Sequence, residues 1–484
     1  MTNFYRFEAI SLRKIFLAFF AVSALWLFIA RSVNTFGYLN LTSQNPLFSG
    51  DEPKYLRMAY SLTKDGDVDL SDLIVTPQER EQIRAEALRR GSFGFAGIYV
   101  VGRDGRIYGL HLPGIAAFLW PAFALDSRRF PPDPTKSPKE LFFLPQELNA
   151  TRLWLMVTAF LTLLLAIRFL DKIFRCLFLE VVLILFWVLN SPFPDYSYLI
   201  YPEAVSTLFF LLTLNAILFP YRRRWLNDAF IVAGISALPW LHQRYIPAAL
   251  GLFLVFLLNS RWTRPGRKRL AVLCAGFVLT SLPYLYYFYS ITGNPSPLSP
   301  QLAAIGGVFA RTRTLPLGFF GQIFSRDWGL LWFSPWLIFV LIGFYRTFKT
   351  DRSIALSLSI ILVPYYLMCS AASPWNASTY PPGRFLEPLL PLLLVFAGFA
   401  LRDLFRRFSI PRLVVYGGWL LAVLLNAKTG WLNLDFGFST VNSREFLRMG
   451  ICFFLLLVLY LSLYASDKFP SKRVETASES LRAR

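Results

Sequence analysis

The stretch GLHLPGIAAFLWPAFAL, residues 109–125, decides how the chain is arranged across a membrane. It is apolar over about 17 residues, the lower limit for a membrane-spanning helix, and it contains Pro113 and Pro121. If it crossed the membrane, every basic loop downstream would face the outer side, against the positive-inside rule. We therefore predict an interfacial or re-entrant helix on the outer face. Residues 33–150 then form one long extracytoplasmic segment.

The composition is that of a polytopic membrane protein. Of the 484 residues, 55% are hydrophobic and 16% are charged, and the mean hydropathy is +0.47, which excludes an ordinary soluble multidomain protein. The net charge of +20 comes mostly from short clusters between apolar runs, a pattern that indicates membrane topology and not nucleic-acid binding. The four cysteines lie far apart in apolar runs, and there are only two histidines, which excludes a disulfide framework and a histidine-rich metal site.

Apolar runs predict an all-α fold with about twelve membrane spans. The predicted spans are residues 14–32, 151–169, 176–194, 203–220, 228–246, 247–260, 270–291, 329–345, 354–373, 385–401, 412–427 and 447–465. The basic loops fall in alternate connections, at residues 168–175, 221–225, 260–269, 345–352 and 402–412. The positive-inside rule places these loops and both termini in the cytoplasm. We expect one transmembrane domain over residues 1–466 and a polar cytoplasmic tail over residues 467–484.

Polar side chains from separate segments gather on the predicted outer face. They are Asp51 and Glu52 after the first span, Glu203 at the start of the fourth, His242, Arg244 and Tyr245 at the end of the fifth, and Arg384 at the start of the tenth. Charges at such depth are costly and usually functional.

Each of these residues also has a simpler interpretation. Asp51 is placed to cap an amphipathic helix, and Glu203 is a favourable charge at a helix start. The two arginines would contact lipid headgroups, and His111 and His242 would be hydrogen-bonded interfacial residues. The nearby aspartates Asp65, Asp67, Asp69 and Asp72 alternate as in a calcium loop, but Leu70 and Thr76 replace its glycine and glutamate. We predict a solvated loop there.

The outer-face residues suit displacement of a phosphate leaving group at the membrane surface. A carboxylate accepts a proton from the attacking hydroxyl or amine. Cationic side chains, or a divalent ion between carboxylates, stabilise charge that develops on the phosphate. An apolar groove would hold the lipid.

The same motifs resemble the GT-C superfamily of integral-membrane glycosyltransferases, in particular its bacterial branch of aminoarabinose transferases and protein O-mannosyltransferases. They are the Asp51-Glu52 pair followed by Tyr55, His111-x-Pro113-Gly114, Tyr201-Pro202-Glu203, His242-x-Arg244-Tyr245 and Gly383-Arg384. The resemblance runs over residues 14–400, and the order and sidedness of the motifs carry it.

The resemblance implies an enzyme that inverts the anomeric carbon of a sugar taken from a polyprenyl-phosphate donor. By motif matching, Asp51 is the catalytic base with Glu52 as its neighbour, and Glu203 orients the site or binds a metal together with Asp51. Arg244 and Arg384 are implied as ligands of the donor phosphate, and Tyr55, His111, His242 and Tyr245 are implied as further residues of the substrate site. The YPE motif stands where oligosaccharyltransferases have DxD, which leaves the metal open, so no cofactor is certain.

The resemblance also implies the partners and the location. They are a polyprenyl-phosphate-linked sugar, membrane lipids and an acceptor that is a lipid, glycan or protein, without nucleic acid. We expect a multi-pass protein of the inner membrane in the cell envelope, with its active site on the periplasmic or outer side. The alternatives are a transporter or flippase of lipid-linked anions, a polymerase or ligase of surface glycans, and a non-catalytic assembly factor. A transporter would show repeats, and a polymerase would have its large outer loop late in the chain.

Overall fold

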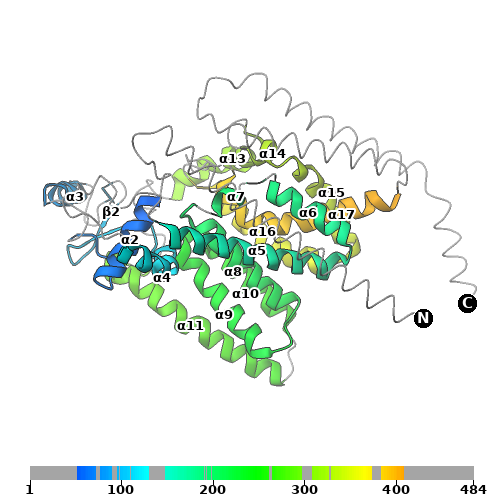
Figure 1. Cartoon of the computed structure of the whole chain (residues 1–484), viewed down its shortest axis with the longest axis horizontal. Helices are drawn as coiled ribbons and strands as arrows, with labels where there is room; N and C mark the ends of the chain where they lie inside the picture. Colours follow the sequence, from blue (N-terminus) through cyan, green and yellow to red (C-terminus); the bar gives the residue numbers. More distant parts are fainter. Residues whose placement is uncertain are drawn as a thin grey trace, which may run out of the picture.

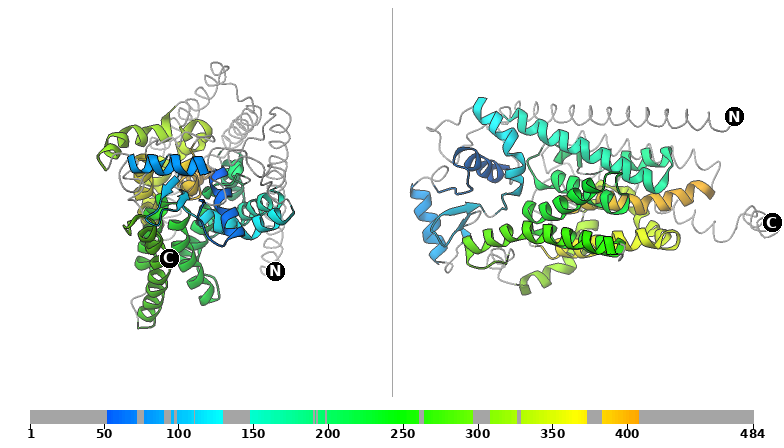
Figure 2. Two further views of the ribbon diagram at one scale, coloured as in Figure 1. Left: turned by 90° about the vertical axis from the view of Figure 1, so that its left-hand side faces the viewer. Right: turned by 90° about the horizontal axis from the view of Figure 1, so that it is seen from below.

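The structure is a computed structural model that describes residues 52–71, 77–89, 95–96, 99–109, 111–129, 148–189, 191, 193–197, 199–260, 264–296, 308–325, 329–372 and 383–407. Helices form an elongated bundle, and a smaller head lies at one end of it (Figures 1 and 2). Asp51, the polar tail and the predicted spans over residues 14–32, 412–427 and 447–465 lie outside the described residues.

The described part of the bundle consists of apolar helices joined by short connections. They are α5 (Asn149–Phe174), α6 (Leu177–Leu189), α7 (Phe193–Tyr196), α8 (Pro202–Leu218), α9 (Arg224–Leu241), α10 (Ile246–Asn259), α11 (Arg264–Thr292), α13 (Val308–Phe324), α14 (Leu330–Phe333), α15 (Ile338–Thr350), α16 (Arg352–Ser370) and α17 (Leu390–Arg407). Three 3₁₀ helices join them, namely η2 (Gln243–Tyr245), η3 (Pro335–Leu337) and η4 (Arg384–Leu389).

Within these described residues, four helices are long and apolar enough to cross a membrane. They are Asn149–Phe174, Arg269–Thr292, Arg352–Ser370 and Arg384–Asp403. The chain is therefore a membrane protein, as predicted, whereas the predicted span count, domain division and extent of the outer segment stay predictions.

Several predicted spans are interrupted in the described residues, and two of the breaks have a local cause in the backbone. The span over residues 228–246 ends at Leu241, because His242 has extended backbone angles (φ −167°, ψ 143°) that close α9. The span over residues 329–345 is divided among α14, η3 and α15, with Pro335 at the break. Proline removes a backbone donor and clashes with the preceding turn, which explains the second interruption.

The head contains α2 (Glu52–Lys64), α3 (Pro77–Arg89) and a three-stranded antiparallel sheet of β1 (Phe95–Ala96), β2 (Tyr99–Val101) and β3 (Ile107–Gly109). The all-α prediction is wrong here. The turn between β2 and β3 contains Asp104-Gly105, and Gly105 has a φ of +75°, a backbone region that glycine enters without steric cost. Asp-Gly between short apolar runs is a strong hairpin signal.

Hydrogen bonds attach the head to the bundle. Arg103 donates its backbone N–H to the carbonyl of Ile291 at 2.9 Å, close to the end of α11. The segment after α2 is fixed to the sheet, since Leu70 donates to the carbonyl of Ile107 at 2.8 Å and Ile107 donates to Ser71 Oγ at 2.8 Å. The head therefore lies beside the C-terminal end of α11.

Helix α4 (Gly114–Arg129) confirms the helix predicted from residues 109–125. It packs against α2 and α5, with Ile115 and Phe123 fully buried and Trp120 and Leu125 exposed. At its end, Asp126 accepts hydrogen bonds from the backbone N–H groups of residues 150 and 151 at 2.9 and 2.8 Å. This side chain caps α5 from a distance in the sequence, because the neighbouring Leu148 has no capping oxygen.

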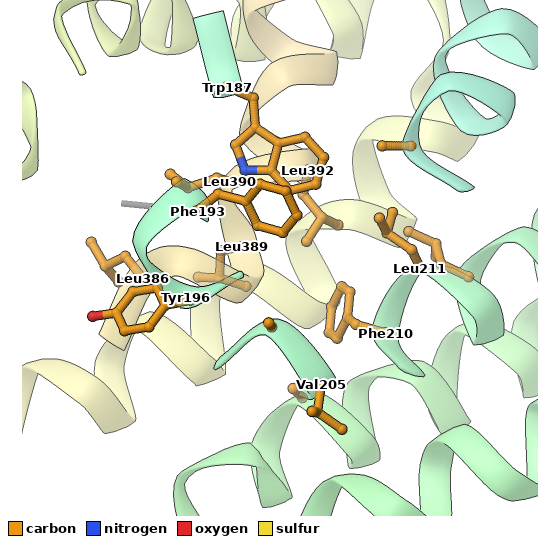
Figure 3. Packing of buried hydrophobic residues seen from close by; sticks show 14 of the residues in the cluster. Trp187, Phe193, Tyr196, Val205, Phe210, Leu211, Leu386, Leu389, Leu390 and Leu392 are labelled. Atoms are coloured by element: carbon orange, nitrogen blue, oxygen red, sulfur yellow. The ribbon is translucent and has the colours of Figure 1, made fainter. Parts of the chain in front are cut away.

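The buried core lies where α6, α7, α8, η4 and α17 meet. Figure 3 shows Trp187, Phe193 and Phe210 together with Leu386 and Leu390 in this cluster. The rings of Trp187 and Phe193 are 4.2 Å apart between centroids. Burial of such rings stabilises the junction, which also holds the first turns of α8 and η4.

We expect Gly114→Ala to destabilise the protein by about 1–3 kcal/mol, because the contact between α4 and the end of α9 has no room for a side chain. A Cβ at Gly114 would lie 2.3 Å from the carbonyl oxygen of Trp240. Thermal unfolding in detergent measures the change. Gly276→Ala is the control, since its Cβ would meet only the Val232 side chain at 3.3 Å. Equal unfolding temperatures for both variants would contradict the prediction.

Candidate functional site

A fully buried carboxylate, Glu203, is the centre of the site. Tyr201 has extended backbone angles before the helix and Pro202 occupies its first turn, so Glu203 enters the bundle at the start of α8. Its Oε1 atom accepts hydrogen bonds from Arg384 Nε at 2.7 Å and from Arg244 Nη2. Both arginines are nearly buried, with exposed fractions of 5% and 7%.

Arg244 is positioned by the break between α9 and α10. Its backbone N–H donates to Nδ1 of His242 at 3.2 Å, and its Nη2 donates to the Tyr245 hydroxyl at 3.0 Å. Its guanidinium lies 4.5 Å from the ring centroid of Phe385. Hydrogen bonds and a cation–π contact on several sides hold this group in one place.

Arg384 is positioned by a glycine. Gly383 has a φ of +74°, and a Cβ there would lie 2.5 Å from Leu330, so both the backbone angle and the available space require glycine. The Arg384 guanidinium then lies 4.1 Å from the ring centroid of Tyr201. The glycine in the Gly383-Arg384 motif thus has a direct structural purpose.

A second glutamate, which the sequence analysis missed, lies beside this group. Glu387 is fully buried in η4, three residues after Arg384, and its carboxyl group is near enough to that of Glu203 for the two to interact electrostatically. Two arginines and two glutamates therefore share one buried region. The sequence signal was present, since Glu387 is an acidic residue in an otherwise apolar predicted span.

Glu52 has a buried partner of its own. It is 2% exposed and accepts hydrogen bonds from Arg152 Nη1 at 2.5 Å and from the backbone N–H of Ile200 at 2.8 Å. These contacts tie α2 to α5 and to the segment that leads into Glu203. The structure shows these contacts of Glu52, whereas its participation in catalysis stays a prediction. Arg152 was missed, although it is an arginine in a predicted span.

The predicted histidines and tyrosines form a connected row beside this site. The ring of His111 lies 5.2 Å from that of Tyr55 and 6.4 Å from that of His242, and His242 lies 6.2 Å from Tyr245. Nε2 of His111 is 3.3 Å from Nζ of Lys54. Lys54 was not predicted; it lies in the first turn of α2, two residues after Glu52.

The described residues give little support to a divalent ion at Glu203. Two guanidinium groups already bind the same carboxylate oxygen, and their charge opposes a cation there. In the described part of the chain, no three His, Cys, Asp or Glu side chains are grouped closely enough to hold a metal. Asp51, the other predicted ligand, lies outside the described residues.

The site therefore brings together every predicted residue that the structure describes. Glu52, Tyr55, His111, Glu203, His242, Arg244, Tyr245 and Arg384 come from five segments and meet at the head end of the bundle. Chemically, the arrangement offers guanidinium groups for an anion and histidine side chains for hydrogen bonding or proton transfer.

No protein-family model and no curated protein sequence matches the chain. Solved structures that resemble it include ArnT from Cupriavidus metallidurans in the apo state, with 14% identity, a TM-score of 0.45 and coverage of 91% of this chain and 70% of that one. The same protein bound to undecaprenyl phosphate gives 13% identity, a TM-score of 0.47 and coverage of 92% and 71%. The Archaeoglobus fulgidus oligosaccharyltransferase in the apo form gives 12% identity, a TM-score of 0.47 and coverage of 84% and 54%.

We expect Glu203→Gln to lower the free energy of unfolding by about 3–5 kcal/mol, because it leaves two buried guanidinium groups without their shared anion. Denaturant unfolding in detergent measures this change. Asp228→Asn is the matched control: its ion pair with Arg269 is partly exposed, and such pairs contribute about 1 kcal/mol or less. An equally small effect for both variants would show that the buried arginines find other partners.

Proposed function

We propose that the protein is an inverting glycosyltransferase of the GT-C type, which moves a sugar from a polyprenyl-phosphate donor to a lipid, glycan or protein acceptor. The observation that carries this proposal is the meeting of Glu52, His111, Glu203, Arg244 and Arg384 at one end of an apolar bundle. Buried charges from distant segments are costly to collect, and they usually mark a functional site.

In the proposed reaction, an acceptor hydroxyl or amine attacks the anomeric carbon from the face opposite the phosphate. The carbon–oxygen bond to the phosphate breaks, and its electron pair leaves with the phosphate. Asp51 accepts the proton of the acceptor. The contacts of Glu52, which directly follows Asp51 in the sequence, support this assignment. Arg152 and the backbone of Ile200 hold Glu52 beside the site.

Cationic side chains would stabilise the leaving phosphate. Arg244 and Arg384 are both bound to Glu203, so a phosphate at these residues would have to share or replace that carboxylate. Lys54, beside His111 and partly buried, is a further candidate that reaches the phosphate without opening the buried ion pairs. We propose that Lys54 contacts the phosphate first and that the arginines supply the positive field behind it.

The position of the basic loops supports a site on the outer side of the inner membrane. The starts of α5 and α8 and the ends of α9 and α11 lie near the head, as their contacts with Asp126, Glu52, Gly114 and Arg103 show. The basic connections therefore join the opposite helix ends. If those ends are cytoplasmic, the head and the site face outward.

We expect Asp51→Asn to reduce sugar transfer by about 10²- to 10⁴-fold without loss of folded protein, because asparagine keeps a helix cap but accepts no proton. Transfer from radiolabelled polyprenyl-phosphate sugars is measured in membranes with matched expression. Asp65→Asn, on an exposed residue at the end of α2, is the control.

Equal transfer by wild type and Asp51→Asn would remove Asp51 from catalysis. No transfer from any donor, together with movement of the labelled lipid across vesicles, would favour a transporter or flippase instead.

A further inference from the structure

A cavity of about 570 Å³ lies between the head and the bundle, within the usual size range of small-molecule sites. One end is polar and belongs to the head, where Asp67, Asp69, Arg106 and Tyr108 line it. The other end is apolar and belongs to α4, α8, α9 and α11, where Phe118, Phe209, Trp240, Leu241 and Ile291 line it. A ligand that fills this cavity must therefore have a polar head and an apolar part.

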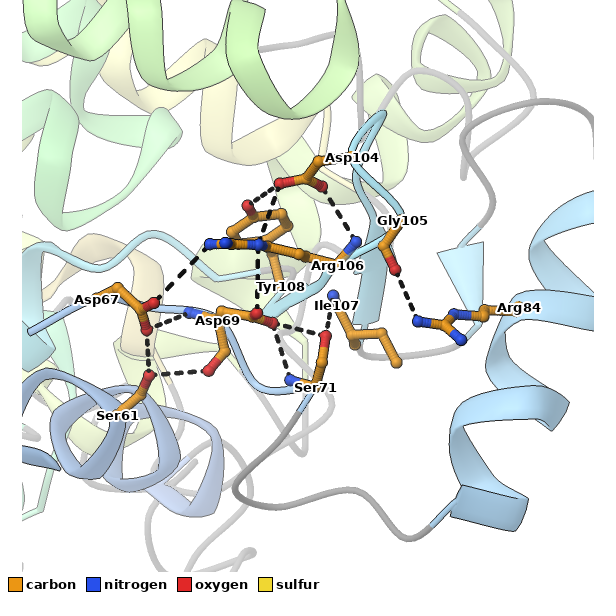
Figure 4. A network of polar contacts seen from close by, with 10 residues as sticks. All are labelled: Ser61, Asp67, Asp69, Ser71, Arg84, Asp104, Gly105, Arg106, Ile107 and Tyr108. Atoms are coloured by element: carbon orange, nitrogen blue, oxygen red, sulfur yellow. Dashed lines mark hydrogen bonds and ion pairs between the residues drawn. The ribbon is translucent and has the colours of Figure 1, made fainter. Parts of the chain in front are cut away.

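The polar end carries an excess of negative charge. Arg106 is surrounded by three carboxylates: its Nε lies 3.6 Å from Asp69 Oδ2 and 3.7 Å from Asp104 Oδ2, and its Nη1 lies 3.9 Å from Asp67 Oδ2 (Figure 4). Asp69, followed by Tyr108 and Asp104, raises the pKa of Arg106, and burial with the hydrogen bond to Asp104 raises the pKa of Tyr108. One cation thus faces three anions, which disfavours a phosphate head here.

Hydrogen bonds within the head fix the orientation of two of these carboxylates. Oδ1 of Asp67 accepts from Ser61 Oγ and from the backbone of Asp69, and Oδ1 of Asp69 accepts from Ser71. The Oδ2 atoms face Arg106 at more than 3.5 Å, longer than a hydrogen bond. The predicted role of these aspartates as a merely solvated loop is therefore too simple, because two of them have fixed orientations at a cavity wall.

The apolar end is aromatic and adjoins the candidate site. The ring of Trp240 lies 5.8 Å from that of Tyr287, and the ring of Phe118 lies 6.1 Å from that of Phe209. Aromatic rings contact the apolar faces of sugars as well as lipid chains. Gly114 and Leu241 also line the cavity. Gly114 follows His111 by three residues, and Leu241 directly precedes His242.

We propose that this cavity binds the sugar head of an amphipathic acceptor, with hydroxyl or ammonium groups on Asp67 and Asp69 and the start of its lipid chain against the aromatic wall. This proposal extends the proposed function and rests on it, because the ligand is an acceptor only if the protein transfers a sugar to it. The phosphate of the donor binds elsewhere, because the negative end of the cavity repels it.

Ala117→Trp tests the proposal by filling the cavity without a change of charge, since Ala117 lines it from α4. Leu125→Trp is the matched control, as it adds the same ring to an exposed position of the same helix. The full chain in lipid nanodiscs is titrated with dodecyl glucoside, dodecyl glucosaminide and dodecyl phosphate. Thermal unfolding confirms that each variant is folded.

We expect wild type and Leu125→Trp to bind both glycosides at least about tenfold more tightly than the phosphate, and Ala117→Trp to lose about tenfold in glycoside binding. If Ala117→Trp does not fold, the double variant Asp67→Asn/Asp69→Asn provides the same test, because asparagine keeps the Oδ1 acceptors. It should reduce the preference for the cationic glucosaminide by about tenfold.

Unchanged glycoside binding in the folded variants, or phosphate binding as tight as glycoside binding, would overturn the cavity proposal. Sugar transfer is measured separately on the same proteins. Loss of glycoside binding in Ala117→Trp with no transfer by wild type would leave the cavity standing and reject the proposed function. Sugar transfer by wild type, together with glycoside binding that Ala117→Trp does not weaken, would support the proposed function and reject the cavity proposal.

Discussion

The ion pairs of Glu203 with Arg244 and Arg384 are the constraint on which the site depends. They join the start of α8, the break after α9 and the start of η4, three parts of the chain that lie far apart in sequence. In an apolar interior, each of these charges is strongly unfavourable alone and tolerated only with its partners. The three backbone segments must therefore meet in one arrangement, which gives the bundle a defined junction where apolar packing alone is not directional.

The breaks in the helices make this junction possible. His242 closes α9 with an extended backbone, and Gly383 begins η4 with a left-handed one. In a continuous helix, the helical repeat would set the direction of each arginine side chain. The breaks change the backbone direction, so that Arg244 and Arg384 both point towards the same carboxylate. Irregular backbone at this depth is tolerated where it is buried in protein, and the residues that follow the two breaks, Arg244 and Arg384, are buried.

The junction and the cavity divide two kinds of chemistry between neighbouring regions. The buried region contains guanidinium groups that attract anions, and the head end of the cavity contains carboxylates that repel them. The row of rings from Tyr55 through His111 to His242 lies beside the residues that line the cavity. Under the proposed function, a phosphate-bearing donor and a hydroxyl-bearing acceptor would be sorted by charge before they react.

The sequence by itself determined that this is a helical membrane protein and that polar residues at the ends of its helices form the candidate site. Long apolar runs and motifs such as YPE and HQRY are local features, and they predict helices and helix ends directly. Only the tertiary structure decided the partners: Arg152 for Glu52, Lys54 for His111, Glu387 near Glu203, and the cavity under the head. The short interruptions and the small sheet also escaped the apolar pattern. The physical reason is that ion pairs and cavities depend on distances between segments, and hydropathy along one chain contains no such distances.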